Sequence, residues 1–433
     1  MSENTNNRTV SQTEIKKVNS YAWITYAILA VIYMFVAFHR NSPGVMRGSL
    51  EEAFNANAQQ FAMIGSSFFY AYLIMQVPAG ILNDKFGPKK IALIFTTITA
   101  IGSVLFGLAQ SLTVAYIARF LVGFGVSVMF ISLIKIQNTW FPSNKQALMV
   151  GITGIVANLG AMFAQTPLVW LSNTIGWRMT FIALGILTAV FVAMIAFFVK
   201  DKPEDIGLPS MADIEGREVN RQPVKVTTAL KSVLSNKYTW ISAVVFFGLY
   251  TGYIMLLGTF GTSFVVERYG VSVSQAANYM IVASIGALVA GIVIGSMSDK
   301  MKNRKSMLII YTILTVIAWA IFVYVKLPNM LLIPLLFILG FVMSAFALCW
   351  TISNETNDPR FGGISSAVVN TIGYSGSAIA PVIMGNFIDQ DPTFAGYQRG
   401  FLIVIILIAV GALVAFILPE THAKNISAEL NTK

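Results

Sequence analysis

Long apolar stretches separated by short polar loops dominate the chain. A membrane-spanning helix needs about 20 mostly apolar residues, and twelve stretches meet that length. They cover residues 21–47, 58–83, 90–110, 113–138, 146–171, 177–199, 238–265, 272–298, 305–326, 329–353, 362–389 and 398–418. Membrane β-strands would show only weak alternating segments of about ten residues. The pattern therefore predicts an all-α membrane protein with twelve transmembrane helices.

One long polar break divides these stretches into six and six. The predicted domains are an N-terminal tail (1–20), a first half (21–199), a central loop (200–237), a second half (238–418) and a C-terminal tail (419–433). The end of the central loop, TTALKSVL, predicts a short amphipathic helix on the membrane surface.

Two similar loops support a repeat at half the chain length. GILNDKFGPKK begins at residue 80 and GSMSDKMKNRK at residue 295. In both, a Gly precedes an Asp by four positions and a Lys follows the Asp: Gly80 with Asp84, and Gly295 with Asp299. Two parallel six-helix repeats are a known plan of transporters, whose site lies between the halves near the membrane midplane.

Composition and charge agree with a membrane protein. Hydrophobic residues make up 56% of the chain and charged residues 11%, too few to cover a surface that faces water. The net charge is +10, and 21 of the 29 Lys and Arg residues fall in the two tails and alternate loops. This bias predicts that both termini are cytoplasmic, and it argues against a nucleic-acid-binding stripe.

The sequence gives no sign of catalysis or metal binding. The chain has one Cys and two His, so it has neither a possible internal disulfide nor a zinc-ligand spacing. Two histidines, one of them in the tail, and no clustered acids on one helix argue against a membrane enzyme. We expect no cofactor and no metal.

The repeated loops resemble the signature of the major facilitator superfamily. GILNDKFGPKK is similar to its loop between spans two and three, through Gly80, Asp84, Gly87 and Lys89; GSMSDKMKNRK resembles the degenerate copy, through Gly295, Asp299 and Arg304. IARFLVGFGVS resembles the Arg-x-x-x-Gly-x-Gly pattern of span four and begins that pattern at Arg119. The resemblance implies the major facilitator fold, alternating access between two six-helix halves, a monomer, and a gate at these loops.

A narrower resemblance points to the anion:cation symporter branch. His39-Arg40 stands where that branch carries Asp-Arg, and the Phe-x-x-x-Tyr-x-x-x-Gln run and the Trp-Phe-Pro that ends span four also match. Two acids of the branch that are associated with proton coupling are replaced, by His39 and Val126. Coupling therefore stays open: His39 takes over the role, or the protein is a facilitator or exchanger.

Ionisable residues inside spans indicate function, because each costs about 2.5–3.5 kcal/mol on insertion scales. Arg40 offers a bidentate fork to a carboxylate or phosphate, and Lys135 is a second candidate for the cavity. On a straight helix Arg119 and Lys135 point about 160° apart, so we assign Arg119 to a structural ion pair or gate. His39 and Glu355 are candidate coupling residues; snorkelling or a solvated loop is the ordinary alternative for Lys135 and Glu355.

Polar and aromatic groups at membrane depth complete the expected pocket. Tyr72, Tyr253, Trp350 and Asn370 are assigned to substrate binding, and Tyr33, Gln165, Tyr250 and Tyr374 are weaker candidates. Interhelical packing is the alternative for each of them.

The charges favour one class of transported solute. The basic residues that remain inside the membrane, Arg40, Arg119 and Lys135, all lie in the first half, and no acid lies deep in any span. We therefore predict a transporter of a small organic anion or an amino-acid-like zwitterion in a bacterial inner membrane, with protons as the possible coupling ion. A dipeptide or amino-acid uniporter and a drug or siderophore exporter are the alternatives.

Overall fold

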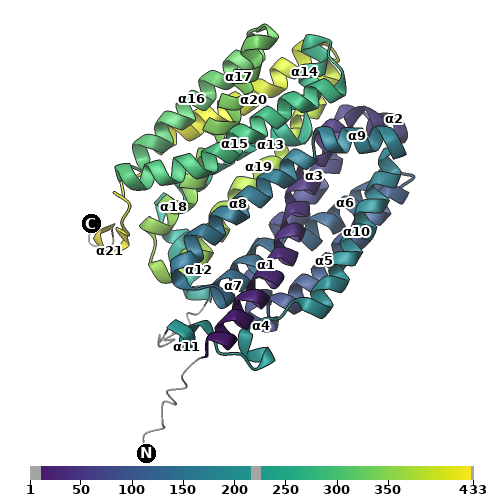
Figure 1. The fold of residues 1–433 in the computed structure, drawn as a ribbon. Helices are drawn as coiled ribbons and strands as arrows, with labels where there is room; N and C mark the ends of the chain where they lie inside the picture. The colour runs from purple at the N-terminus through teal and green to yellow at the C-terminus, as the bar shows by residue number, and fades with distance from the viewer. Residues whose placement is uncertain (1–10, 216–225, 431–433) are drawn as a thin grey trace, which may run out of the picture.

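The computed structural model describes residues 11–215 and 226–430, and this part of the chain holds helices and no strands (Figure 1). Within these described residues, eleven helices are long and apolar enough to cross a membrane, and a bent pair of helices, counted as one span, brings the number to twelve. The predicted all-α membrane fold is therefore confirmed.

The first half contains the first six spans. They are α1 (Gln12–Asn41), α3 with α4 (Ala58–Ile74 and Gln76–Phe86), α5 (Pro88–Leu108), α6 with α7 (Leu112–Val126 and Met129–Trp140), α8 with α9 (Gln146–Phe163 and Thr166–Ile175), and α10 (Trp177–Phe198). The short helices η1 (Ser42–Val45) and α2 (Arg47–Phe54) connect α1 to α3. The segments α3 and α4 meet at an angle of 51°.

The second half contains the other six spans. They are α13 with the π-helix η4 (Lys237–Ile254 and Met255–Thr259), α15 (Val273–Met301), α16 (Lys305–Tyr324), α17 with η5 and α18 (Asn329–Met343, Ser344–Phe346 and Ala347–Thr356), α19 (Gly362–Gln390) and α20 (Phe394–Ala415). Helix α14 (Gly261–Tyr269) follows η4, and α21 (Ser427–Leu430) lies in the C-terminal tail.

The structure changes the predicted start of the first span and gives the bounds of the predicted amphipathic helix. Helix α1 begins inside the segment predicted as a tail, because Ser11 and Glu14 form a capping box at its start. The predicted amphipathic helix of the central loop is present as α12 (Val226–Ser235), which packs Ala229 and Val233 against the second half. Residues 216–225 of that loop lie outside the described residues.

The α-helix of span four is interrupted at Ser127 and Val128, although its two segments form one span. Helix α6 ends at Val126 and α7 begins at Met129. Gly123 in α6 lies so close to α3 that a Cβ there would be 2.1 Å from the carbonyl oxygen of Phe68. Arg119 lies in α6 and Lys135 in α7, on either side of this interruption.

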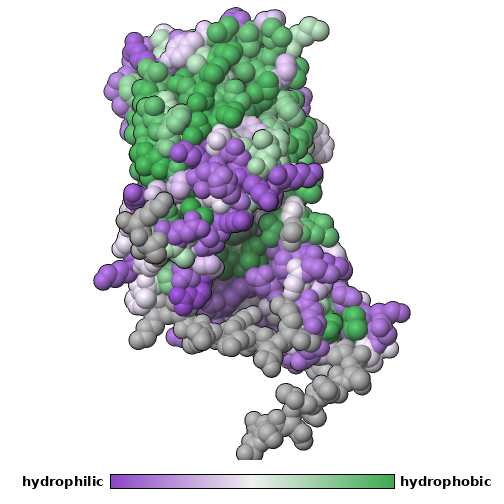
Figure 2. Space-filling view, turned by 90° about the vertical axis from the view of Figure 1, so that its left-hand side faces the viewer, coloured by the Kyte–Doolittle hydropathy of each residue, from purple (hydrophilic) through white to green (hydrophobic). Residues whose placement is uncertain are grey.

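The halves meet at one end of the bundle and separate at the other. We call the end that carries both chain termini the termini side and the opposite end the far side (Figure 1). In the described part of the chain, every hydrogen bond between the halves lies at the level of Arg40 or farther toward the far side. Figure 2 shows a hollow bordered by polar residues, with apolar residues in its depth. The structure is therefore open toward the termini side.

Candidate functional site

Arg40 lies between the two halves and is surrounded by tyrosines. Its Nη1 donates a hydrogen bond to the Tyr250 hydroxyl at 2.7 Å. Its guanidinium carbon lies 5.1 Å from the ring centroid of Tyr72 and 5.3 Å from that of Tyr374. Tyr72 belongs to α3 in the first half, whereas Tyr250 and Tyr374 belong to α13 and α19 in the second. Arg40 thus contacts both halves at once.

The charge of Arg40 has no carboxylate partner in the described part of the chain. No ion pair joins it to an acid among residues 11–215 and 226–430, and its buried Nε has no partner in the protein. Guanidinium carries five donors and stays charged in proteins. Tyrosine rings offset part of that charge through cation–π contacts, which leaves donors for an anion.

An aromatic cluster extends from Arg40 into the second half. Tyr253 stacks on Tyr250 with 5.6 Å between ring centroids. The ring centroids of Trp350 and Phe246 are 5.4 Å apart, and Phe246 itself stacks on Tyr250. Trp350 Nε1 donates to Asn370 Oδ1 at 2.7 Å. The structure therefore brings five predicted binding residues into one region: Arg40, Tyr72, Tyr253, Trp350 and Asn370.

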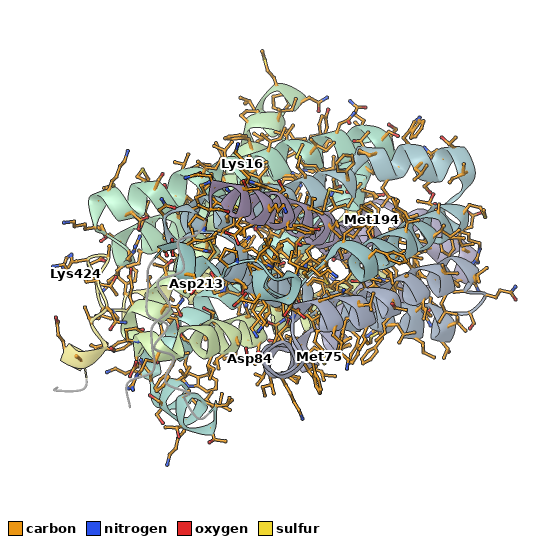
Figure 3. The ribbon with its side chains drawn as sticks, turned by 60° about the horizontal axis from the view of Figure 1, so that its bottom comes forward. Lys16, Met75, Asp84, Met194, Asp213 and Lys424 are labelled. Carbon is orange, nitrogen blue, oxygen red and sulfur yellow. The ribbon has the colours of Figure 1, made fainter. Side chains whose placement is uncertain are left out.

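Lys135 does not join this region. Its Nζ lies 2.5 Å from Asp84 Oδ1 on the termini side, and the two side chains are 32% and 74% exposed. Figure 3, which looks onto the termini side, shows Asp84 far from Lys424 of the C-terminal tail. In this conformation Lys135 holds the signature-loop acid rather than facing Arg40; its role in substrate binding stays a prediction.

His39 and Arg119 face into the first half. Arg119 Nη2 donates to the carbonyl oxygen of His39 at 2.7 Å, and both side chains are buried. The ion pair expected for Arg119 is not formed among the described residues, because no acid lies near it and the end of α1 provides a carbonyl instead. Nothing connects the His39 ring with Arg40, so its role in coupling stays a prediction.

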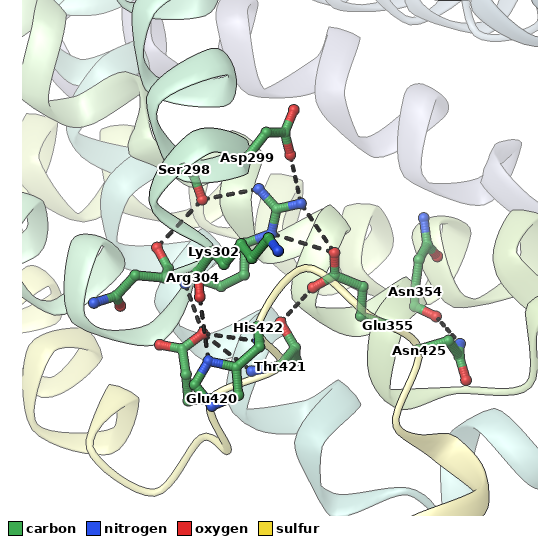
Figure 4. A network of polar contacts seen from close by, with 11 residues as sticks. Ser298, Asp299, Lys302, Arg304, Asn354, Glu355, Glu420, Thr421, His422 and Asn425 are labelled. Carbon is green, nitrogen blue, oxygen red and sulfur yellow. Dashed lines mark hydrogen bonds and ion pairs between the residues drawn. The ribbon is translucent and has the colours of Figure 1, made fainter.

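Glu355 belongs to a charged network on the termini side of the second half (Figure 4). Its carboxylate accepts from Arg304 Nη2 at 3.0 Å and from the Thr421 hydroxyl. Arg304 also pairs with Asp299 at 2.6 Å and donates to Ser298. This places Glu355 with the predicted gate residues Asp299 and Arg304, whereas a coupling role is not tested by its geometry.

The glycines of the signature loops differ in their surroundings. Gly87 has a φ of +82°, and a Cβ there would lie 2.9 Å from the Asp201 carboxylate. That acid also accepts a hydrogen bond from the Lys89 backbone N–H at 2.7 Å. Gly80 and Gly295 have open space where a Cβ would point. No neighbouring helix of the described chain packs against these two glycines in this conformation, in which the halves are apart on the termini side.

Contacts on the far side close the site there. Asp389 of α19 accepts from the backbone N–H groups of Ala58 and Gln59 at 2.8 and 3.0 Å, at the start of α3. Arg47 contacts the Tyr397 hydroxyl of α20. Together with the open termini side, these contacts describe one end state of an alternating-access cycle.

The fold and this division into halves match a known family. A model of the Major Facilitator Superfamily matches residues 29–381. The chain belongs to the Major Facilitator Superfamily. Solved structures share the fold: a D-xylose–proton symporter has a TM-score of 0.72 at 17% identity, covering 94% of this chain and 100% of that one. A bacterial homologue of the human lysosomal transporter Spinster, inward-facing and unoccupied, has a TM-score of 0.70 at 16% identity, covering 95% and 98%.

Curated relatives in the superfamily are named as transporters. A probable sulfoacetate transporter of Cupriavidus necator is 25% identical over 401 residues, covering 89% of this chain and 91% of that one. A probable galactarate/D-glucarate transporter of Escherichia coli is 26% identical, covering 85% and 89%. A hexuronate transporter of Bacillus subtilis is 22% identical, covering 84% and 89%. The predicted resemblance to the anion:cation symporter-like branch is confirmed, and the chain is a secondary transporter of small solutes.

Sequence reasoning gave too little weight to the residues closest to Arg40. Tyr250 and Tyr374 were only weaker candidates, although one bonds the guanidinium and the other lies against it. Tyr250 and Tyr253 are one helical turn apart, a spacing that places both on one face. Their direction relative to Arg40 depends on how the halves pack, which the spacing does not show.

Proposed function

We propose that this transporter carries a small organic anion and that Arg40 binds its acid group. The observation that carries the proposal is a charged guanidinium between the halves that contacts tyrosines and, among the described residues, forms no ion pair with a carboxylate. An unpaired charge at membrane depth is unfavourable, so an anionic ligand that pairs with it gains binding free energy. The names of the curated relatives, which refer to sulfoacetate, galactarate, glucarate and hexuronate, support the same class.

The tyrosines suggest how binding is linked to the transport cycle. Tyr72 is contributed by the first half, and Tyr250 and Tyr374 by the second. A solute bound at Arg40 therefore contacts both halves, and its binding energy depends on their relative position. The tyrosine hydroxyls and the Trp350–Asn370 pair offer neutral hydrogen-bonding groups for the rest of the solute.

Direction and coupling are further parts of the proposal. We propose a bacterial inner membrane with both termini in the cytoplasm, on the strength of the distribution of Lys and Arg. The open termini side is then the cytoplasmic side. Proton coupling through His39 stays a prediction; comparing uptake with and without a pH gradient decides it. The described residues near Arg40 include no acid, which disfavours export of lipophilic cations.

A ligand-stabilisation screen tests the proposed substrate class. The panel holds sulfoacetate, hexuronates, aldarates, amino acids and dipeptides, each added to purified protein. A ligand at 100 times its Kd stabilises the folded state by about 2.7 kcal/mol. We expect an organic acid to raise the melting temperature of the wild type and of the surface control Arg399→Gln.

The same acid should bind Arg40→Gln about 10–100-fold more weakly, because a hydrogen bond to a charged group is worth about 1.5–3 kcal/mol. Stabilisation by neutral or cationic compounds alone, or an organic acid that binds Arg40→Gln as tightly as the wild type, would contradict the proposal.

A further inference from the structure

Arg119 and His39 form a second buried polar group that the Arg40 site does not use. The Arg119 side chain is 1% exposed and that of His39 is 0% exposed. The only hydrogen bond of the Arg119 guanidinium within the described protein is from Nη2 to the His39 carbonyl oxygen, at 2.7 Å. The guanidinium thus lies beside the last turn of α1, inside the first half.

Four side-chain nitrogens of this pair have no hydrogen-bond partner among the residues that the structure describes. They are Nε and Nη1 of Arg119 and both ring nitrogens of His39. A buried donor without an acceptor is unfavourable by about 1–3 kcal/mol, and more when the group is charged. Groups of this kind in a folded protein indicate a partner that is not a protein side chain.

The carbonyl oxygen compensates only part of the arginine charge. The carbonyl end of a helix carries roughly half a negative charge. The oxygen of His39 is at that end of α1, and it also accepts from the Ser42 hydroxyl at 3.2 Å. No carboxylate of residues 11–215 and 226–430 forms an ion pair with Arg119. A net positive charge therefore remains inside the first half.

Phenyl rings enclose the pair. The guanidinium carbon of Arg119 lies 5.3 Å from the ring centroid of Phe68 and 5.7 Å from that of Phe106. The ring of His39 lies 6.1 Å from that of Phe181, and the Phe106 and Phe181 rings are 4.8 Å apart. Packed apolar walls of this kind leave no route for an organic acid of the size that Arg40 would bind. They suit a monatomic ion with a weakly held hydration shell.

We propose that Arg119 and His39 bind a small inorganic anion, a halide such as chloride, at a site separate from the Arg40 site. The free donors of Arg119 and one N–H of the His39 ring point to the ligand class, and the ion balances the remaining charge. The ion is a structural ligand of the first half. This inference does not depend on the proposed substrate, so the two fail independently.

Thermal stability in matched salts tests the site. Purified protein is melted in sodium sulfate and in sodium chloride or bromide at equal ionic strength. A monovalent halide that occupies the site should give the wild type a saturable rise in melting temperature of about 2–4 °C. Arg40→Ala should keep this rise, because its substitution leaves the Arg119 environment intact.

His39→Asp is the informative variant, because it supplies an internal carboxylate beside Arg119. It should melt in sulfate at or above the wild-type temperature and should no longer respond to halide. Arg119→Gln should lose the response as well. Three results would overturn the proposal: equal melting temperatures of the wild type in halide and sulfate, a halide response that persists in His39→Asp, or a halide response that disappears in Arg40→Ala. Equal melting temperatures would assign water to the unpaired nitrogens.

Crystals grown in bromide give an answer that needs no variant. Bromide scatters anomalously, and the proposal predicts a peak within hydrogen-bonding distance of Arg119 Nε or Nη1. A peak beside Arg40 alone, or no peak in the first half, would contradict it even if the variants were too unstable to purify.

Discussion

The two halves organise their termini sides with opposite arrangements of charge. In the first half, the loop acid Asp84 pairs with the basic Lys135 of span four. In the second half, the base Arg304 pairs with the acidic Glu355 of span ten. The side chains of the first pair are 74% and 32% exposed, whereas those of Arg304 and Glu355 are 7% and 14% exposed. Related loops thus form a solvent-exposed pair in one half, whereas in the other half the base Arg304 and the acid Glu355 are largely buried and only the loop acid Asp299 is exposed.

In contrast to the ion pairs, both halves have an acid after their last span that caps the start of a helix. Asp201 follows span six and accepts from the backbone N–H of Lys89 at the start of α5. Glu420 follows span twelve and accepts from the backbone N–H groups of Arg304 and Lys305 at the start of α16, at 2.7 and 2.9 Å. A carboxylate at a helix N-terminus satisfies free donors and the helix dipole. The halves therefore share the capping of a helix and differ in the energetics of the adjoining ion pair.

Removing the base from each pair gives the largest expected contrast. Arg304→Gln leaves Glu355 buried without its cation, and we expect it to destabilise the protein by about 3 kcal/mol. Lys135→Gln leaves only an exposed Asp84, and we expect a loss of about 0–1 kcal/mol. Unfolding of the purified variants, followed by tryptophan fluorescence, measures both.

The double variant Arg304→Gln/Glu355→Gln is the control for this contrast. It removes both buried charges, so it should recover most of the stability that Arg304→Gln loses. Equal losses in the two single variants would mean that burial does not distinguish the networks.

The far-side contact between the halves offers a smaller, conformational effect. Asp389→Asn removes the negative charge that accepts two backbone N–H groups at the start of α3. Each 1.4 kcal/mol of stabilisation that this contact loses shifts the conformational equilibrium tenfold. We expect more of the state that is open on the far side, with longer distances between spin labels there.

The neighbouring acid Asp391 is the matched control, because it bonds locally to Thr393 and Arg399. Asp391→Asn should leave the label distances unchanged. The role of Asp389 as a contact between halves would be excluded if both variants gave wild-type distances.

The shared helix caps should contribute similarly in the two halves. We expect Asp201→Asn and Glu420→Gln each to destabilise the protein by about 1 kcal/mol, the typical value of an N-terminal cap. Melting temperatures compare them directly. A loss several times larger for one cap would show that it also supports the ion pair of its half.

The pH dependence of the Asp201 cap gives the smallest effect. Burial raises the pKa of the Asp201 carboxyl above its ordinary value of 3.8, although the Lys89 N–H opposes this shift. An acid with a raised pKa in the folded state binds its proton more tightly there, so its stability contribution grows as the pH falls through that pKa. Wild type should gain stability relative to Asp201→Asn as the pH falls from neutral. A relative loss would contradict the direction of the shift.

The sequence was sufficient to predict the fold, because length and hydropathy define spans directly. Twelve apolar stretches, one long polar break and two related loops predicted the two six-helix halves. The break in span four was not predicted, since neither Ser127 nor Val128 interrupts the apolar pattern. That break depends on the packing of the span against its neighbours.

The site was predicted in part, for a related reason. Arg40, Tyr72 and Trp350, which the structure brings into one region, stand out in the sequence because polar and aromatic groups at membrane depth are conspicuous in an apolar sequence, and their role in binding stays a prediction. The partners of Lys135 and Arg119 were not predicted, because Asp84 lies about 50 positions from Lys135 and a backbone carbonyl has no sequence signal. Which charges pair depends on how the helices pack, and hydropathy does not contain that information.

Uptake into proteoliposomes tests the central claim most directly. The organic acid that stabilises the protein would be supplied outside vesicles that contain wild type, Arg40→Gln or the surface control Arg399→Gln. The account predicts saturable uptake by the wild type and the control, and at least a tenfold loss of uptake at low substrate concentration for Arg40→Gln, since the bidentate acid contact is removed. Uptake by Arg40→Gln at the wild-type rate would show that the acid group binds elsewhere and would contradict the account.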